Sequence, residues 1–264
     1  MGLIDKFDAF CFDLDGTILL GNELLPGAKE IIDFIRKENK KIQFITNSPT
    51  QTRIDCQDRL HGLGITSDLE EIFTSAYISA IYFSKNFPES TVFIVGEQAV
   101  KEEFERLSVK MTNDPLESTH VLVGLDRSFT YEKLNSAMIS VRNGAKIIVT
   151  NPDPYCPVSG GYIADTFSIA RAIEVASGQT VFDVIGKPST FYGDQMLSQL
   201  NIEKERCLII GDRLETDVLL SEKNKFHSCL VLTGVASRED VEEKRIYPSI
   251  IEKDLETLLH YLEQ

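Results

Sequence analysis

The sequence predicts an α/β protein: a doubly wound, mostly parallel sheet with a second, smaller α/β domain inserted into it. Three observations lead to this prediction. Short apolar segments alternate with helical segments along the 264 residues, a pattern typical of parallel sheets covered by helices on both faces. Several apolar segments end in acidic or small polar residues, as strands do where such sheets bind ligands. The alternation pauses near 86–90 and then begins again, which indicates an inserted unit.

Each element is predicted from its apolar pattern and its flanking residues. The first strand, 7–12, is aromatic and apolar apart from Asp8, and the first helix starts near Pro26 and ends near Lys40. The later strands are predicted at 41–45, 72–75, 92–95, 121–123, 147–149, 181–185, 207–210 and 230–232, with an edge strand at 248–251. The later helices are predicted at 50–60, 76–84, 98–107, 131–143, 165–176, from 189 to 200, and at 255–262.

The order of these elements divides the chain into two predicted domains. Residues 1–84 and 183–264 form the doubly wound core, and residues 85–182 form the inserted, smaller α/β domain. The chain is long enough to bury a sizeable core without disulfides. Its five cysteines are scattered with no Cys-x-x-Cys pair, so neither a zinc site nor a disulfide framework is expected.

Charge and hydropathy limit the possible partners. The net charge of −14 argues against binding to nucleic acid or anionic membranes, and a phosphate-bearing substrate would need a local cation. No run of about 18 apolar residues and no signal peptide is evident. We therefore expect a cytoplasmic protein.

Four strand ends carry side chains suited to chemistry. In chain order they are Asp13 and Asp15, Thr46 and Asn47, Lys187, and Asp212 with Asp217. Carboxyl ends of parallel strands lie along one edge of a sheet, so these groups are expected to converge. Clustered carboxylates repel one another unless a cation neutralises them, and oxygen ligands beside a phosphate are typical of Mg²⁺ sites.

Other interpretations of single residues remain open at this point. Thr46 and Asn47 suit phosphate binding but could also cap the helix that follows, and the two roles are compatible. Asp165 could bind a substrate hydroxyl or cap the helix that starts there. The four histidines lie outside every motif.

The four motifs resemble those of the haloacid dehalogenase (HAD) superfamily. They are Asp13-Leu14-Asp15-Gly16-Thr17, Thr46-Asn47, Gly186-Lys187-Pro188, and Gly211-Asp212 with Asp217. The inserted segment with Thr150-Asn151-Pro152-Asp153 is similar to the α/β cap (class IIA) of the NagD-like, p-nitrophenylphosphatase branch, and Tyr162-Ile163-Ala164-Asp165 is similar to sugar phosphatases encoded with arabinose-utilisation genes.

The resemblance implies roles for these residues. Asp13 would be the nucleophile that becomes an aspartyl phosphate, and Asp15 the general acid and base. The phosphate would be bound by Thr46, with Asn47 beside it, and by Lys187. Mg²⁺ would be held by Asp13, the backbone carbonyl of Asp15 and Asp212, with Asp217 in support. In the cap, substrate specificity would involve Asp153, Tyr155 and Asp165.

The implied activity is a Mg²⁺-dependent phosphomonoesterase for small phosphorylated metabolites, most of all sugar phosphates. Pyridoxal 5′-phosphate or nucleotides are alternative substrates, and a phosphomutase or a non-catalytic binding module are alternative functions. The family resemblance also makes the cap a candidate homodimer surface. The segment after Asp217 departs from the family pattern because residues 219–226 contain no glycine.

Overall fold

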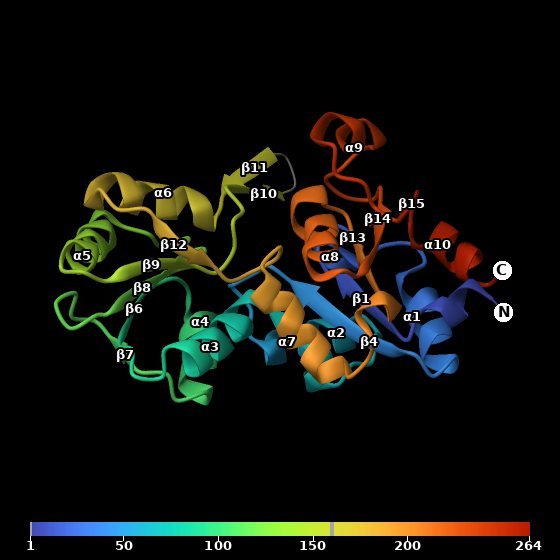
Figure 1. Cartoon of the computed structure of the whole chain (residues 1–264), viewed down its shortest axis with the longest axis horizontal. Coiled ribbons are helices and arrows are strands. Elements are labelled where there is room, and N and C mark those ends of the chain that lie inside the picture. The colour runs from blue at the N-terminus through green and yellow to red at the C-terminus, as the bar shows by residue number, and fades with distance from the viewer. Residues whose placement is uncertain (1, 159–160) are drawn as a thin grey trace. The chain divides into compact units, whose positions relative to one another are not determined.

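The computed structural model describes residues 2–158 and 161–264, and they group into two units. The first unit comprises the chain up to Thr46, Cys56–Phe73 and Lys187–Gln264, and the second comprises Asn47–Asp55 and Thr74–Gly186. Each unit is built around its own parallel sheet (Figure 1). No helix among the described residues is long and apolar enough to cross a membrane.

The sheet of the first unit has six strands with β1 near its centre. The strand order is β15 (Ile250–Glu252), β14 (His227–Val231), β13 (Cys207–Gly211), β1 (Ala9–Asp13), β4 (Lys41–Thr46) and β5 (Ile72–Thr74). Phe12 of β1 lies opposite Ile210 of β13 and Phe44 of β4, in parallel register on both sides. The carboxyl ends of β1, β4 and β13 therefore lie along the same edge of the sheet.

Helices cover both faces of this sheet, as the doubly wound prediction requires. They are α1 (Ala28–Lys37), α2 (Arg53–Gly62), α7 (Thr190–Leu200), α8 (Leu219–Asn224), α9 (Arg238–Lys244) and α10 (Leu255–Leu262). On one face, Phe10 and Phe12 belong to a buried cluster with residues of α1, α2 and α10. On the other face, the Gln43 side chain donates a hydrogen bond of 3.2 Å to the backbone of Met196 in α7. Alternate residues of each strand thus serve opposite helical layers.

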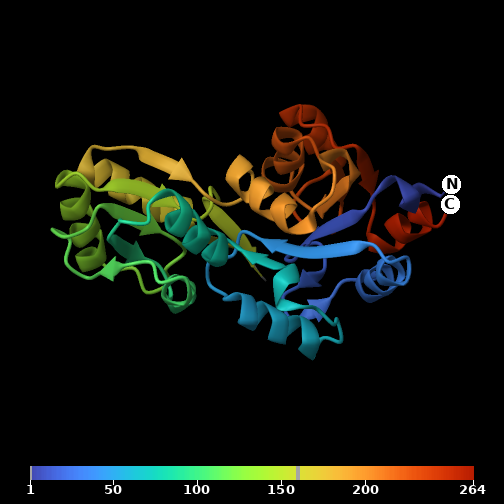
Figure 2. The ribbon, with the colours of Figure 1, turned by 60° about the horizontal axis from the view of Figure 1, so that its bottom comes forward.

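The second unit has a five-stranded parallel sheet. Its order is β12 (Val181–Val184), β9 (Lys146–Val149), β8 (His120–Val123), β6 (Val92–Val95) and β7 (Met111–Thr112). The helices are α3 (Ser75–Asn86), α4 (Gln98–Arg106), α5 (Tyr131–Arg142) and α6 (Thr166–Ser177), and β10 (Tyr155–Val158) pairs with β11 (Gly161–Ala164) (Figure 2). Val141 of α5 and Ile173 of α6 pack on the strand residues Val123 and Val149.

The structure confirms the fold class and most predicted elements, and it adds short ones. The sequence did not predict the hairpin of β2 (Leu19–Leu20) and β3 (Glu23–Leu24), nor β7, α9 or the β10–β11 hairpin. Short helical turns were also not predicted: η1 (Leu3–Lys6), η2 (Leu69–Glu71), η3 (Lys204–Arg206) and η4 (Leu214–Val218). The last strand begins at Ile250 rather than 248, and the expected loop at 160–161 lies partly outside the described residues.

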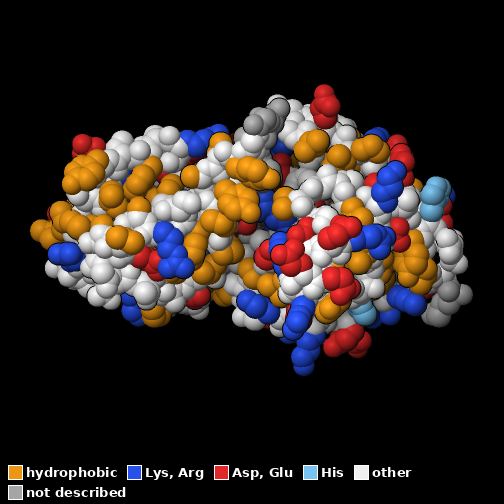
Figure 3. Space-filling model, turned by 90° about the horizontal axis from the view of Figure 1, so that it is seen from above, with side chains coloured by type: hydrophobic (Ala, Val, Ile, Leu, Met, Phe, Trp, Pro, Cys, Tyr) orange, Lys and Arg blue, Asp and Glu red, His pale blue; other side chains and the backbone are white. Residues whose placement is uncertain are grey.

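The observed units differ in their boundaries from the predicted domains. Helix α3 and residues 47–55 group with the second unit, although the sequence placed them in the core. The chain returns from the second unit to the first after Gly186, rather than after residue 182 as predicted. That the first unit is catalytic and the second a cap stays a prediction. Charged and hydrophobic side chains are interspersed over the face shown in Figure 3.

Candidate active site

A buried cluster of three carboxylates and one ammonium lies at the carboxyl edge of the first unit's sheet. Asp13 is the last residue of β1, and Asp212 directly follows β13. Asp217 comes from the π-helical turn η4, and one carboxylate oxygen from each of the three residues lies within 4.8 Å of the others. The structure thus brings together the three acids that the sequence singled out from strand ends and the following turn.

Lys187 is the cation of this cluster. Its Nζ donates to Asp13 Oδ1 at 2.5 Å and to Asp217 Oδ1 at 2.7 Å. The lysine is 1% exposed, so both ion pairs are removed from water. Removing either partner from a pair of this kind would leave a buried charge uncompensated. Lys187 precedes Pro188, and the peptide bond between them is cis.

Burial and mutual repulsion shift the acid–base properties of the cluster. Burial raises the pKa of Asp13 well above its usual value against the opposing effect of Lys187, and Asp217 and Asp212 add to the rise. Burial, reinforced by Asp217, raises the pKa of Asp212 to about 6. Burial alone would lower the pKa of Lys187, but the adjacent Asp13 and Asp217 outweigh it and raise the pKa.

The donor set fits a divalent cation. When all three carboxylates are ionised, they exceed the ammonium of Lys187 by two negative charges in a buried site. Burial and mutual repulsion oppose that ionisation, since they raise the pKa values of Asp13 and Asp212. Asp212 Oδ1 is buried and has no hydrogen-bond partner among the described residues, which is costly unless a ligand takes it up. A cation bound by carboxylate oxygens would satisfy that atom and cancel the excess charge.

Glycines make room for Asp212. A Cβ added at Gly234 would lie 1.9 Å from Asp212 Oδ2, and one added at Gly16 would lie 2.5 Å from the same atom. The backbone N–H of Val235 donates to this oxygen at 2.7 Å. The loops after β1 and β14 therefore hold the Asp212 carboxylate in one orientation by close backbone approach.

Thr46 ends β4 beside this cluster's strand and is held by a buried tyrosine. Tyr192 of α7 accepts a hydrogen bond from the Thr46 backbone N–H at 3.2 Å and donates to the carbonyl oxygen of Phe73 at 2.7 Å. Tyr192 is fully buried. The tyrosine thus joins the ends of β4 and β5, a role that sequence reasoning missed because its only signal was a tyrosine in the first turn of an amphipathic helix.

Asp15 lies apart from the carboxylate cluster. Its side chain is 53% exposed, and its Oδ1 accepts a 3.0 Å hydrogen bond from Arg59 Nη2 of α2. A solvent-accessible carboxylate two residues from Asp13 is placed to exchange protons with water. The sequence predicted Asp15 as a site residue and missed Arg59.

Asn47 and Asp153 form a second polar group, within the second unit. Asp153 Oδ2 accepts hydrogen bonds from Asn47 Nδ2 at 3.0 Å and from Asn151 Nδ2 at 2.8 Å. Thr46 and Asn47 do not cap α2, because Thr52 and Asp55 form the reciprocal side-chain contacts at that helix start. Phosphate binding by Thr46 and Asn47 stays a prediction.

The other two predicted cap residues have different surroundings. Asp165 caps α6, accepting from the backbone N–H of Thr166 at 2.6 Å, and burial raises its pKa, with Asp153 adding to the rise. Tyr155 is exposed on β10, with its ring 5.2 Å from that of Tyr162 on β11. Of the two roles considered for Asp165, helix capping is observed.

The segment after Asp217 contains no glycine, and helix α8 ends at Asn224 with a lysine in the capping position. Lys225 follows α8 in the left-handed conformation, with φ of 63°, which a glycine would adopt at lower cost. Asn224 packs against Gly193 of α7, where an added Cβ would lie 2.3 Å from the amide carbon. The departure from the family pattern is thus accommodated locally by one strained residue.

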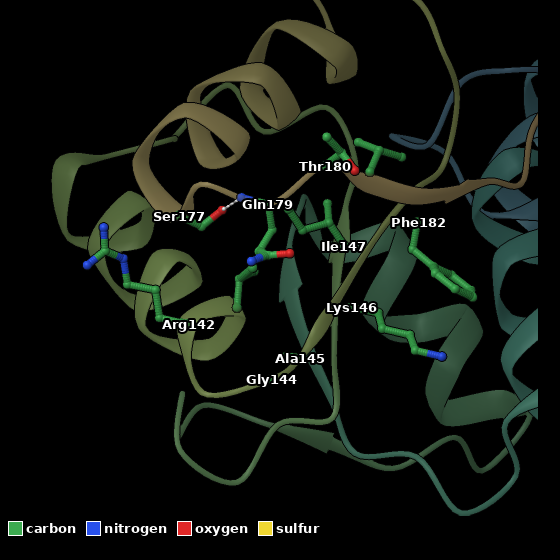
Figure 4. Close-up of a pocket in the computed structure, with 11 residues that line it drawn as sticks. Arg142, Gly144, Ala145, Lys146, Ile147, Ser177, Gln179, Thr180 and Phe182 are labelled. Atoms are coloured by element: carbon green, nitrogen blue, oxygen red, sulfur yellow. Dashed lines mark hydrogen bonds between the residues drawn. The ribbon is translucent and has the colours of Figure 1, made fainter.

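A pocket of about 830 Å³ opens elsewhere, between the ends of α5 and α6 in the second unit (Figure 4). Its lining includes Arg142, Lys146 and Phe182, and the Lys146 ammonium lies 4.1 Å from the centre of the Phe182 ring. None of the predicted site residues lines it.

The fold and the buried cluster together define an α/β protein with a carboxylate site suited to a divalent cation. Comparison with known proteins names the family. The family model described as haloacid dehalogenase-like hydrolase matches residues 10–110, and a second HAD-hydrolase-like model matches residues 184–258. The chain belongs to the haloacid dehalogenase-like hydrolase family.

Curated relatives and a solved structure agree with this assignment. The acid sugar phosphatase of Staphylococcus epidermidis is 34% identical over 98% of this chain and 99% of its own length. The sugar-phosphatase AraL of Bacillus subtilis is 34% identical over 89% and 85% of the two chains. The crystal structure of 4-nitrophenylphosphatase from Thermotoga maritima matches with a TM-score of 0.92 and 33% identity over 98% and 99%. The family resemblance stated from the motifs is confirmed.

Proposed function

We propose that this protein is a Mg²⁺-dependent phosphomonoesterase that hydrolyses small phosphorylated metabolites, above all sugar phosphates. The observation that carries the proposal is the buried Lys187 bound to both Asp13 and Asp217, beside an Asp212 oxygen that accepts no hydrogen bond from the part of the chain that the structure describes. This arrangement combines a carboxylate nucleophile, a fixed cation and a carboxylate oxygen that could bind a metal ion, as phosphoryl transfer to an aspartate needs.

Sugar phosphates are the preferred substrate class because both relatives described above are named sugar phosphatases and together they align with nearly the whole chain. A specific sugar is not assigned. The second unit, as a cap, would select the leaving group, with Asp153 and Tyr155 as candidate specificity residues. Asp165 would contribute to specificity indirectly, because it caps α6 and so positions the start of that helix.

In the first step, an Asp13 oxygen attacks phosphorus and the bond to the ester oxygen breaks. Lys187 holds the Asp13 carboxylate by one oxygen, which leaves the other oxygen to attack. Asp15 gives a proton to the departing oxygen, so the product leaves as an alcohol. Asp217 accepts a second hydrogen bond from the Lys187 ammonium at 2.7 Å, which restricts the orientation of the ammonium.

In the second step, Asp15 takes a proton from water, and the resulting oxygen attacks the phosphorus of the acyl phosphate. The bond between phosphorus and the Asp13 oxygen breaks, which regenerates the carboxylate and releases inorganic phosphate. Thr46, positioned through its backbone by Tyr192, would bind the phosphoryl oxygens.

Asp13, Asp212 and the backbone carbonyl of Asp15 would hold Mg²⁺, with Asp217 in support. When bound, the ion would neutralise the phosphoryl oxygens and lower the cost of bringing an anion to these carboxylates. The divalent character is suggested by the two excess negative charges of the cluster.

Hydrolysis of p-nitrophenyl phosphate with Mg²⁺, with EDTA, and by the D13N variant tests this proposal. We expect turnover with Mg²⁺ only and none from D13N. Phosphate release from a panel of sugar phosphates, pyridoxal 5′-phosphate and nucleotides then ranks the substrates. Transfer of the phosphoryl group to a second position of the sugar, without phosphate release, would instead favour a phosphomutase.

We also propose that the second unit can form a homodimer surface. Most of the exposed large hydrophobic side chains of the described residues belong to this unit, including Tyr131, Val175 and Phe182. Light scattering at micromolar concentration tests this, and a monomer mass would contradict it.

A further inference from the structure

Arg59, in the last turn of α2, binds the loop that carries Asp15. Its Nη2 lies 3.0 Å from Asp15 Oδ1 and 2.5 Å from the carbonyl oxygen of Gly21. The Arg59 side chain is 19% exposed and the Asp15 side chain 53%, so the arginine is the more shielded from water of the two. Neither contact is part of the buried cluster described above.

The helix that carries Arg59 is held firmly in the first unit. On the same helix Cys56 and Leu60 are fully buried in the core, and the Gln57 side chain donates to the Ser67 carbonyl at 2.8 Å. The position of the guanidinium is therefore set by the packed body of the first unit.

The loop that Arg59 binds is short and closed. The Gly16 N–H donates to the Leu19 carbonyl at 2.7 Å, and Gly21 lies in the turn between β2 and β3. One guanidinium thus connects the Asp15 carboxylate, the adjacent hairpin and helix α2. Arginine suits this task because its planar donors have a fixed geometry.

We propose that Arg59 is a positioning residue that fixes the Asp15 carboxylate for proton transfer. This inference rests on the proposed function. An exposed aspartate can adopt several rotamers. Only a rotamer that places the carboxyl group within hydrogen-bond distance of the leaving-group oxygen allows proton transfer, so the other rotamers are unproductive. Arg59 restricts the carboxylate and the hairpin together, which stabilises one geometry before substrate binds.

The leaving group separates this role from a general structural one. An alkyl phosphate must expel a poor leaving group, so its cleavage depends on a proton from Asp15. p-Nitrophenolate is a stable anion and departs with little need of a proton. Loss of positioning at Asp15 should therefore slow cleavage of alkyl phosphates selectively, whereas loss of folding would slow both.

The experiment compares kcat/KM of R59M and wild type with two substrates: p-nitrophenyl phosphate and the alkyl phosphate hydrolysed fastest in the metabolite panel. We use kcat/KM because it reports the first chemical step, in which the ester bond breaks. For R59M we expect roughly a tenfold fall with the alkyl phosphate and less than threefold with the aryl one. The tenfold fall is smaller than the about 10²- to 10⁴-fold that general acid catalysis contributes, because Asp15 itself is retained.

Arg36 offers a matched control on α1. Its guanidinium also binds one carboxylate and one carbonyl, at 2.7 Å to Glu71 and 2.8 Å to Thr66, away from the cluster. R36M should leave both kcat/KM values unchanged. R59K, which keeps the charge, should recover part of the loss with the alkyl phosphate, and D15N/R59M should be no slower than D15N because the two residues act through one proton transfer.

Several results would overturn the inference. Equal losses with both substrates, accompanied by a lower melting temperature for R59M than for R36M, would show a structural role. Unchanged or increased kcat/KM with the alkyl phosphate would show that Arg59 does not assist Asp15. If wild type releases no phosphate from either substrate, the proposed function itself fails and this inference with it.

Discussion

The substitution Gly234→Ala places a methyl group against the carboxylate that completes the candidate metal site. The added Cβ would lie 1.9 Å from Asp212 Oδ2, and ordinary contact begins at 3.4 Å. The carboxylate or the loop must therefore move by about 1.5 Å. The Val235 N–H, which holds the same oxygen at 2.7 Å, cannot follow without moving the loop after β14.

A displacement of this size has consequences for both binding and chemistry. Perturbing groups that orient a metal ligand typically lowers metal affinity by about 10- to 100-fold. A misplacement of about 1 Å can cost about 10²-fold in rate. We expect G234A to need about 10- to 100-fold more Mg²⁺ for half-maximal activity and to lose roughly 10²-fold in kcat/KM, with about 1 to 3 kcal/mol of overpacking destabilisation.

The assay is a Mg²⁺ titration of p-nitrophenyl phosphate hydrolysis, together with the Mg²⁺ dependence of the melting temperature. Gly62 provides the control, because it is an exposed residue at the end of α2 and a Cβ there meets nothing within 4 Å. G62A should titrate as wild type does. If G234A also titrates as wild type does, Asp212 is not held by close backbone approach in the way described above.

Three further outcomes are expected. K187M should lower the free energy of unfolding of the metal-free protein by about 3 to 5 kcal/mol, because it leaves buried carboxylates unpaired, and urea denaturation should find a smaller loss at pH 5 than at pH 8. In the metal-free wild type, burial raises the pKa of Asp212 from 3.8 to about 6, so the folded protein binds this proton more tightly than the unfolded chain does. The free energy of unfolding should therefore fall by roughly 3 kcal/mol as pH rises from about 4 to about 6, and saturating Mg²⁺ or D212N should remove the fall. Y192F should cost about 1 to 3 kcal/mol and raise KM, because the Thr46 N–H loses its partner; an unchanged KM would contradict this positioning role.

The sequence was sufficient for the fold class and for the acids of the cluster. Asp13 and Asp212 lie at the carboxyl ends of buried apolar strands, and parallel strands bring these ends to one edge although the two residues are 199 positions apart in the chain. The physical basis of the prediction is therefore the sheet itself. Asp217 was grouped with Asp212 because it follows the same strand, and only its role in supporting the metal site came from the family resemblance.

Other features could not be predicted because their signal is weaker than the periodic pattern. The strands of the β2–β3 hairpin have two residues each, too few to show alternation. The β10–β11 hairpin carries exposed Tyr155 and Tyr162, so its pattern does not separate a buried face from an exposed one. Helix α9 did have a readable start, since Ser237 and Asp240 form a capping box.

Contacts between distant segments were the hardest to foresee. Arg59 sits in a helix whose sequence gives no reason to pair it with Asp15, 44 residues away. Phosphate binding by Asn47 stays a prediction, and the hydrogen bond from its side-chain amide to Asp153, 106 residues away, was not foreseen. Both contacts depend on loop geometry, which the apolar pattern of the chain does not encode.

The central claim is that Asp13 takes the phosphoryl group. Rapid acid quench of the wild-type enzyme with substrate and Mg²⁺, followed by mass spectrometry of the peptide that contains Asp13, measures this directly. The account predicts one added phosphoryl group on Asp13 in wild type and none in D13N. A phosphoryl group on another residue, or full turnover by D13N, would contradict it.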